Sequence, residues 1–304
     1  TIKADSKLKS HPLFSQSVSE PIKMEEIQHR HIEVRGLHLH IAESGTGPKV
    51  VILLHGFPEI WYSWRHQMVA LANAGFRAVA PDFRGYGLSD QPPNPQTTTF
   101  MDLCHDLLGI LDQLAISKIA FKDSLLWVYR IFLQESGRAE ADFGRLDAKT
   151  VVRNIYILFS RSEIPIAEEN QEIMDLVEPS APLPPWLSEE DLATYGSLYQ
   201  KSGFQTALQV PYRSLNEQYE IPDPVLKIPM LLIMGGKDYS LKFPGMQEYI
   251  ESGKLKEYAP NSKIVFLPEG THFVQEQLPE VVNKLTVDFL GDYTREVEKV
   301  LVLP

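Results

Sequence analysis

The feature that most constrains this chain is an apolar run that ends in a tight turn. Residues 50–54 are Val-Val-Ile-Leu-Leu, and His55-Gly56-Phe57-Pro58 follows directly. A short, continuous apolar run predicts a strand that is buried on both faces, as in a parallel sheet. The turn brings backbone N–H groups to the carboxyl end of that strand, where such groups can stabilise an oxyanion. Taken alone, the pattern also fits an ordinary loop between a strand and a helix.

Strand and helix patterns alternate on both sides of a segment that has no strand pattern. Further apolar runs of strand length occur at residues 77–82, 119–121, 230–234 and 263–267. Residues 142–222 show helical patterns instead, interrupted by Pro179, Pro182, Pro184 and Pro185. Strands that alternate with helices around such an insertion predict an α/β fold with a mostly parallel sheet and a helical lid.

The sequence therefore predicts three regions. Residues 1–26 are polar and have no apolar stretch of the kind found in secretory signals, so we interpret them as a mobile leader. The α/β core is expected over residues 27–128 and 223–304. The helical lid is expected over residues 129–222.

Two local patterns lie within the predicted core. Alternating residues on either side of Arg35-Gly36 predict a hairpin. His38 and His40 in its second strand are potential metal ligands, but no third ligand is nearby, so we interpret them as one face of a strand. Residues 100–114 predict a helix with one apolar face, made of Phe100, Leu103, Cys104, Leu107, Leu108, Leu111 and Leu114.

Composition excludes some classes of partner. The net charge is −11, from 40 acidic and 29 basic residues, which argues against nucleic acid and anionic membranes as partners. No apolar run is long enough to span a bilayer. The single cysteine, Cys104, excludes an internal disulfide and suits a reducing compartment such as the cytoplasm. The expected partner is a small molecule, and the oligomeric state is expected to be a monomer or a homodimer.

Polar residues follow three further strand patterns. Asp123 and Ser124 follow the strand expected at residues 119–121. Asp238 ends Gly235-Gly236-Lys237-Asp238 after the strand at 230–234, and His272 ends Glu269-Gly270-Thr271-His272 after the strand at 263–267. In open α/β sheets the reactive groups lie at the carboxyl ends of the strands. Each residue alone is a weak signal, because an Asp after a strand is often a turn or cap residue. The chain order nucleophile, acid, histidine is that of α/β hydrolases.

Two motifs carry a more specific resemblance. The segment from His55 to Met68 reads HGFPEIWYSWRHQM, and Asp82-x-Arg-Gly-x-Gly-x-Ser89 follows it. Together they resemble the soluble epoxide hydrolases of the α/β-hydrolase superfamily, especially the plant proteins. The resemblance extends from about His31 to Tyr293. It implies addition of water to a small apolar epoxide to give a vicinal diol, with no cofactor and no metal.

The resemblance also assigns roles to the strand-end residues. It implies that Asp123 is the nucleophile, and an Asp with an ordinary pKa of about 3.9 is ionised at neutral pH and can attack a strained ring without a base. His272, oriented by Asp238, would then activate water to hydrolyse the resulting ester. The backbone N–H groups of Phe57 and Ser124 would hold the oxyanion.

Three more residues receive roles from the same resemblance. Epoxide hydrolases use two lid tyrosines to meet the departing oxygen, and these correspond to Tyr129 and Tyr212. With 12 tyrosines in the chain, either residue also fits simple packing. Glu59 resembles the carboxylate that orders water in these enzymes, and the alternative is a solvated loop residue.

Other reactions of the superfamily fit the residues less well. Serine esterases carry Gly-x-Ser-x-Gly, which this chain lacks, and Ser124 has no flanking glycines. A haloalkane dehalogenase would share the Asp chemistry, but the tyrosine pair fits an epoxide better than a halide.

The resemblance is interrupted after the nucleophile. Only five residues, 124–128, separate Asp123 from Tyr129, whereas a helix and a further strand need roughly 30 residues or more. No glycine stands next to Asp123, where a sharp turn needs small neighbours. The sequence therefore predicts an incomplete core, and the alternative function is a catalytically impaired, truncated isoform or a non-enzymatic relative with weak turnover and poor stability.

Overall fold

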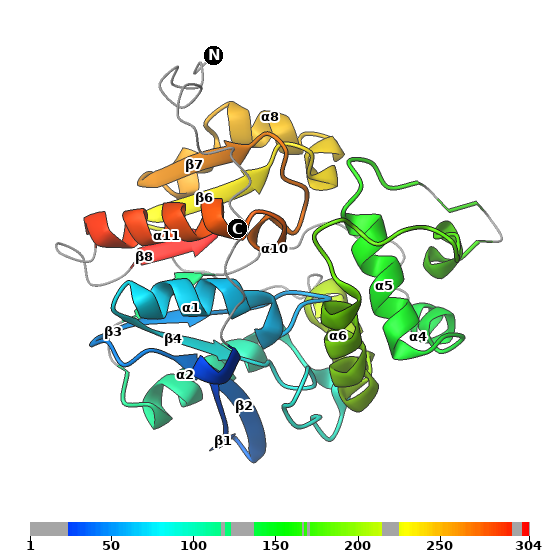
Figure 1. Cartoon of the computed structure of the whole chain (residues 1–304), viewed down its shortest axis with the longest axis horizontal. Coiled ribbons are helices and arrows are strands. Elements are labelled where there is room, and N and C mark those ends of the chain that lie inside the picture. Colours follow the sequence, from blue (N-terminus) through cyan, green and yellow to red (C-terminus); the bar gives the residue numbers. More distant parts are fainter. Residues whose placement is uncertain are drawn as a thin grey trace.

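An eight-stranded sheet organises the molecule, with helices on both faces and a group of helices at one end (Figure 1). The computed structural model describes residues 24–116, 119–122, 137–165, 167–168, 171–214, 225–293 and 300–303. Most of the predicted leader therefore lies outside the described residues, and its last three, Met24–Glu26, form a short 3-10 helix, η2. The strands are β1 (Gln28–Val34), β2 (Leu37–Ser44), β3 (Lys49–Leu53), β4 (Phe76–Pro81), β5 (Ile119–Lys122), β6 (Met230–Gly235), β7 (Ser262–Leu267) and β8 (Val300–Leu303).

The sheet order is β1-β2-β4-β3-β5-β8-β6-β7. From β4 to β7 all neighbours are parallel, whereas β1 and β2 form the predicted antiparallel hairpin. At its turn Arg35 and Gly36 both have positive φ angles, 52° and 78°, as two-residue hairpin turns that match the twist of the strands require. The predicted α/β class and its mostly parallel sheet are confirmed.

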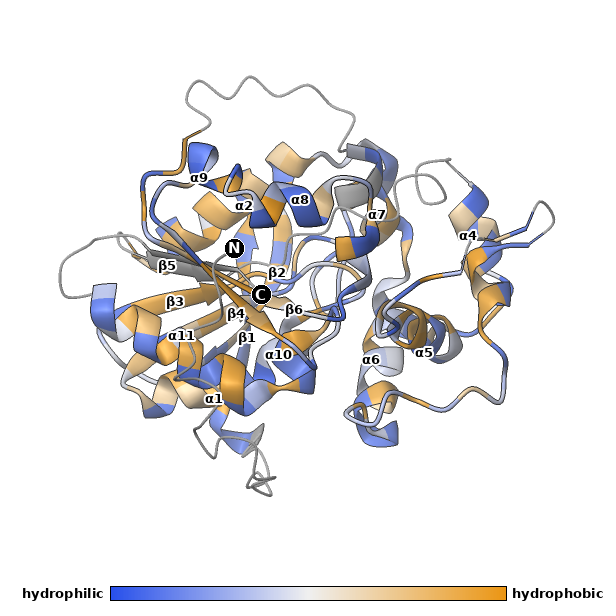
Figure 2. Cartoon of the chain, turned by 90° about the horizontal axis from the view of Figure 1, so that it is seen from above, coloured by the Kyte–Doolittle hydropathy of each residue, from blue (hydrophilic) through white to orange (hydrophobic). Residues whose placement is uncertain are grey.

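Helices cover both faces of the sheet. Figure 2 shows α1 (Arg65–Asn73) and α11 (Pro279–Tyr293) together on one face, and α2 (Phe100–Gln113) and α8 (Met246–Glu251) on the other. A helical insertion stands at one end of the sheet in both views. It comprises α4 (Arg138–Phe143), α5 (Ala148–Phe159), α6 (Glu189–Ser202) and α7 (Gln205–Leu208). The remaining α-helices of the described residues are α9 (Leu255–Tyr258) and α10 (Val274–Gln277).

The predicted gap in the sheet is filled from the end of the chain. Between β5 and β6 along the sequence the described residues contain no strand, but residues 123–136, where the sequence predicts a missing helix and strand, lie outside the described residues. In space, however, β8 lies between them and is parallel to both. Phe121 pairs with Leu301 on one side, and Leu231 pairs with Val302 on the other. The expectation of an incomplete core therefore needs correction for the sheet, which has no vacant position there.

The predicted apolar face of α2 is only partly buried. Leu103, Leu111 and Leu114 are buried, and the last two pack on the core that β1, β2 and β3 form on this side. Phe100 and Leu108, in contrast, are 44% and 57% exposed. These two side chains of the predicted apolar face therefore lie outside the core, because the sheet covers only a narrow stripe of the helix.

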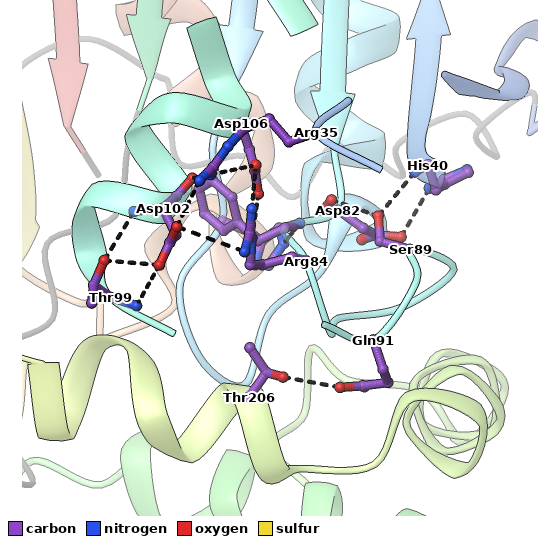
Figure 3. A network of polar contacts seen from close by, with 12 residues as sticks. Arg35, His40, Asp82, Arg84, Ser89, Gln91, Thr99, Asp102, Asp106 and Thr206 are labelled. Atoms are coloured by element: carbon purple, nitrogen blue, oxygen red, sulfur yellow. Dashed lines mark hydrogen bonds and ion pairs between the residues drawn. The ribbon is translucent and has the colours of Figure 1, made fainter. Parts of the chain in front are cut away.

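Asp82, at the end of β4, ties two loops of the core together (Figure 3). Its fully buried carboxylate accepts hydrogen bonds from the backbone N–H groups of Trp61 at 2.9 Å and Leu88 at 3.0 Å. It also accepts one from His40 Nδ1 at 2.8 Å. His40 is thus part of a structural hydrogen-bond network, and the described residues contain no cluster of three or more side chains suited to a metal ion. The two motifs of the family resemblance meet at this carboxylate.

Replacing Asp82 with Ala is expected to lower the free energy of unfolding by about 3 kcal/mol, since two buried donors and one partly buried donor lose their acceptor at about 1–3 kcal/mol each. Chemical denaturation of the purified variant measures this change. The matched control is Asp90→Ala, because Asp90 pairs with His38 at a half-exposed site and should contribute about 1 kcal/mol or less. Equal effects of the two substitutions would contradict the role given to Asp82.

Candidate active site

A carboxylate and an imidazole meet at the carboxyl ends of β6 and β7. Asp238 follows β6 and caps the short 3-10 helix Tyr239–Lys242, where its Oδ1 accepts a hydrogen bond from the Ser240 N–H at 2.8 Å. Its Oδ2 accepts one from His272 Nδ1 at 3.0 Å. β6 and β7 are parallel neighbours, so their carboxyl ends bring these two side chains together. The predicted contact between Asp238 and His272 is confirmed.

Glycine residues allow this close approach of the two loops. A Cβ atom at Gly235 would collide with the carbonyl oxygens of Gly270 and Thr271. A Cβ at Gly270 would in turn stand 3.0 Å from the Cα of Gly235 and 2.7 Å from Val274. The glycines that precede Asp238 and His272 in the sequence are therefore required for the loop after β7 to cross the end of β6.

The contact between Asp238 and His272 shifts the pKa of both side chains. Burial lowers the pKa of His272, but attraction to Asp238 and their hydrogen bond more than compensate, so the pKa lies above its usual 6.5. Burial likewise raises the pKa of Asp238, and the charge and hydrogen bond of His272 together with Ser240 bring it below its usual value. The arrangement favours an ionised Asp238 that orients His272 through Nδ1 and leaves Nε2 for chemistry.

Glu59 is buried beside this pair rather than solvated. Its side chain is 2% exposed, and Gln275 Nε2 donates a short hydrogen bond to its Oε1. Its negative charge is one of the factors that raise the pKa of His272. The alternative of a solvated loop residue is therefore wrong, and Glu59 lies where it acts on His272 electrostatically.

The loop that carries Phe57 is held by aromatic packing and by His55. The Phe57 ring is 1% exposed and lies 6.4–6.5 Å, centroid to centroid, from the rings of Phe143, Tyr199 and Phe204. His55 Nε2 accepts the Phe83 N–H at 3.0 Å, and its Nδ1 lies 2.9 Å from the carbonyl of Gly56. Burial lowers the pKa of His55, so a neutral His55 shapes this loop.

Three predicted site residues lie outside the described residues: Asp123, Ser124 and Tyr129. The strand that leads to them is placed, since Lys122 at the end of β5 pairs with Leu53 of β3. The carboxyl end of β5 thus lies beside the His55 loop. Tyr212 lies in the helical turn Gln209–Arg213, where only its backbone is described.

A buried ionic network was missed by the sequence analysis. Tyr156 of α5 and Tyr195 of α6 both donate hydrogen bonds to Glu276 Oε1, at 3.0 and 2.9 Å. Arg65 Nη1 donates to Glu276 Oε2 at 2.7 Å, and its Nη2 lies 3.0 Å from Asp191 Oδ1. The network joins the helical insertion to the core one turn after His272. The position of Glu276 four residues beyond His272 was the signal available in the sequence.

An open pocket of about 710 Å³ lies between α4, α6 and α7 of the helical insertion and Gln91 of the core. Its lining includes Glu140, Phe143, Tyr199, Lys201 and Phe204. Neither Asp238 nor His272 lines it. It is separate from the Asp238–His272 pair, and the aromatic rings around Phe57 form part of its wall.

Comparisons with known proteins agree with this geometry. A sequence profile of the alpha/beta hydrolase fold matches residues 49–121. Epoxide hydrolase 3 of Siraitia grosvenorii is 32% identical, with 89% of this chain and 100% of that protein covered. Epoxide hydrolase A of Mycobacterium tuberculosis is 28% identical, with 86% and 96% covered. The alignment with the Siraitia protein runs over 320 residues, more than the 304 of this chain, so that relative carries segments with no counterpart here.

Solved structures of epoxide hydrolases are also similar to this chain. An epoxide hydrolase from Vigna radiata superimposes with a TM-score of 0.80 at 31% identity, covering 89% of this chain and 99% of that one. A mutant of potato epoxide hydrolase superimposes with a TM-score of 0.76 at 28% identity, covering 88% and 100%.

Replacing Asp238 with Asn is expected to lower the pKa of His272, because burial then acts without the neighbouring charge. NMR titration of the imidazole measures the shift, with Asp90→Asn as the control that leaves His272 unchanged. The sign for stability follows from linkage. The raised pKa of His272 stabilises the fold below its unfolded value near 6.5, and this contribution is lost as pH rises through the folded pKa. An unaltered His272 titration in Asp238→Asn would contradict the pairing.

Replacing Glu276 with Ala is expected to destabilise the protein by about 3–5 kcal/mol, because Arg65 loses a buried partner. The side chains of Arg65 and Glu276 are 4% and 0% exposed. Glu280→Ala, at an exposed position in the first turn of α11, should cost about 1 kcal/mol or less. Thermal or chemical unfolding compares the two, and a loss near that of the control would reject the network as a structural link.

Proposed function

The chain belongs to the epoxide hydrolases of the α/β-hydrolase superfamily, and from this premise we propose that it adds water to a small apolar epoxide to give a vicinal diol. The observation that carries the proposal is the hydrogen-bonded pair of Asp238 and His272 beside buried Glu59. The pair stands at the same sheet edge as the strand that leads to Asp123. The relatives named above favour an epoxide over the halide and ester substrates of other members of the superfamily.

In the first step, the carboxylate of Asp123 attacks one ring carbon of the epoxide. A new C–O bond forms to the enzyme as the C–O bond of the strained ring breaks, which gives an ester and an alkoxide. Tyr212 and Tyr129 donate hydrogen bonds to this oxygen, which stays on the neighbouring carbon, and one of them transfers its proton to it, so that a hydroxyl and a tyrosinate result. Because an alkoxide is a poor leaving group, this donation is needed for the ring to open at neutral pH.

In the second step, water hydrolyses the ester. His272 takes a proton from the water through Nε2, and Asp238 stabilises the imidazolium that forms. The resulting hydroxide attacks the ester carbonyl of Asp123, and the N–H groups of Phe57 and Ser124 bind the oxyanion. Collapse of this intermediate breaks the ester C–O bond, and the diol oxygen takes the proton held by His272. The acid proton left on Asp123 returns to the tyrosinate, which restores the Asp123 carboxylate. Glu59 helps to order the water, which its buried position near His272 supports.

The proposal extends to organisation and setting. We assign the helical lid to residues 129–222 and the α/β core to residues 27–128 and 223–304. No helix in the part of the chain that the structure describes is both long and apolar enough to cross a bilayer. The net charge of −11 and the single Cys104 support a cytoplasmic monomer or homodimer that acts on a small molecule rather than on nucleic acid.

The two steps can be separated by single-turnover kinetics. Asp123→Asn should abolish turnover of a styrene-type epoxide, because an amide does not form the ester. Tyr212→Phe should slow ester formation by about 10- to 100-fold and leave ester hydrolysis nearly unchanged. Phe substitution at exposed Tyr258 is the control. A Tyr212→Phe variant that slows ester hydrolysis more than ester formation would reject the leaving-oxygen role.

A further inference from the structure

The place of β8 in the sheet joins the two halves of the candidate active site. On one side, residues Ala120, Phe121 and Lys122 of β5 pair in register with residues 300–302. On the other side, Met230, Leu231 and Leu232 of β6 pair with residues 301–303. Figure 1 shows β8 below α11, between the part of the sheet that holds β6 and β7 and the part that holds β3 and β4. β5 leads to Asp123, and β6 leads to Asp238.

The sequence of this segment suits such a place. Residues 300–303 are Val-Leu-Val-Leu, an apolar run with two β-branched residues that is typical of strands buried on both faces of a parallel sheet. This position, next to β5 in the sheet, would otherwise have no strand, because the chain between Asp123 and Tyr129 is too short to supply one. A segment from the end of the chain therefore occupies an interior position of the sheet.

We propose that Val300–Leu303 replaces the missing internal strand and acts as a positioning segment, which sets the nucleophile strand at the correct distance from the Asp238–His272 pair. The consequence for turnover rests on the proposed function, whereas the strand replacement does not. Neighbouring strands lie about 4.8 Å apart, so β5 and β6 are two strand spacings apart only while β8 separates them. An error of about 1 Å in the position of a catalytic group reduces the rate roughly 100-fold.

The chain's own tail is the occupant that the contacts favour. α11 ends at Tyr293 and packs against α1, β6 and β8. Only six residues, 294–299, join it to the strand. A short intramolecular connection gives an effective concentration in the millimolar range, which a second copy at micromolar concentration does not match. The crossover from β7 through α11 to β8 also connects parallel strands of one sheet, as such helices do.

The test uses the full chain with Leu301→Pro, a matched Leu301→Ile control, and a variant that ends at Lys299. Proline removes a backbone donor from a strand that is paired on both sides, whereas isoleucine keeps it. Hydrogen exchange followed by mass spectrometry reports on β5 and β6 directly. A synthetic peptide of residues 294–304 is then added to the shortened chain.

We expect exchange in β5 and β6 to become at least about tenfold faster in Leu301→Pro and in the shortened chain, with β2 and β4 unchanged. For the epoxide substrate, kcat should fall about 100-fold while KM changes less than about threefold, and Leu301→Ile should match the wild type. The peptide should restore protection of both strands and part of kcat. This split between kcat and KM, with rescue by the peptide, is not expected of a merely stabilising tail.

Three outcomes would overturn the inference. The first is unchanged exchange in β5 and β6 after loss of the segment. The second is unfolding of all strands in both variants with no recovery on peptide addition. The third is a wild-type dimer that becomes a monomer on shortening, which would assign the strand to a second copy. If the wild type turns over no epoxide but the exchange pattern and the peptide rescue hold, the proposed function fails and the strand replacement stands.

Discussion

Hydrogen bonding across β5, β8 and β6 is the interaction on which the rest of the site depends. The first half of the sheet, β1 to β5, comes from the first 122 residues, and β6 and β7 come from the chain after residue 229. The His55 loop and the strand to Asp123 belong to the first half, while Asp238 and His272 belong to the second. Within the sheet, only β8 bridges the two halves among the described strands. In the proposed mechanism, the relative placement of the nucleophile and the base therefore depends on a strand that contributes no catalytic group.

Much of the fold follows from local patterns in the sequence. The runs that became β3, β4, β6 and β7 are apolar over a full strand length, and the Arg35-Gly36 turn fixes the hairpin locally. The contact of Asp238 with His272 was predictable because both follow neighbouring parallel strands. β8 was not predictable, because four apolar residues at the end of a chain carry no information about which strands they will pair with. The exposure of Leu108 likewise depends on which elements cover α2.

A buried ionic network holds the helical insertion against the core, and no local sequence pattern predicts this network. Arg65, Glu276, Tyr156 and Tyr195 are far apart in the sequence and meet only when α5 and α6 dock on α1 and α10. Burial raises the pKa of Glu276, and Arg65 and the tyrosine hydroxyls oppose that rise. Removing one partner from such a network lowers the free energy of unfolding by more than the intact network contributes to it. The network therefore favours the one docked arrangement of the insertion in which every partner is present. Because Glu276 lies one turn beyond His272, that arrangement and the position of the base are linked.

The two chemical steps consequently depend on different parts of the fold. In the proposed mechanism, ester hydrolysis needs His272, Asp238 and Glu59, whose contacts are made by β6, β7, α10 and the loop after β3. In the same mechanism, ester formation needs Asp123, whose strand is held on one side by β3 and on the other by β8. Loss of β8 would remove a neighbour both from β5 and from β6, which leads to Asp238, so both proposed steps would be impaired. The segment missing from the interior of the chain and the strand supplied from its end concern the same position in the sheet, so the activity of this chain depends on how well the second compensates for the first.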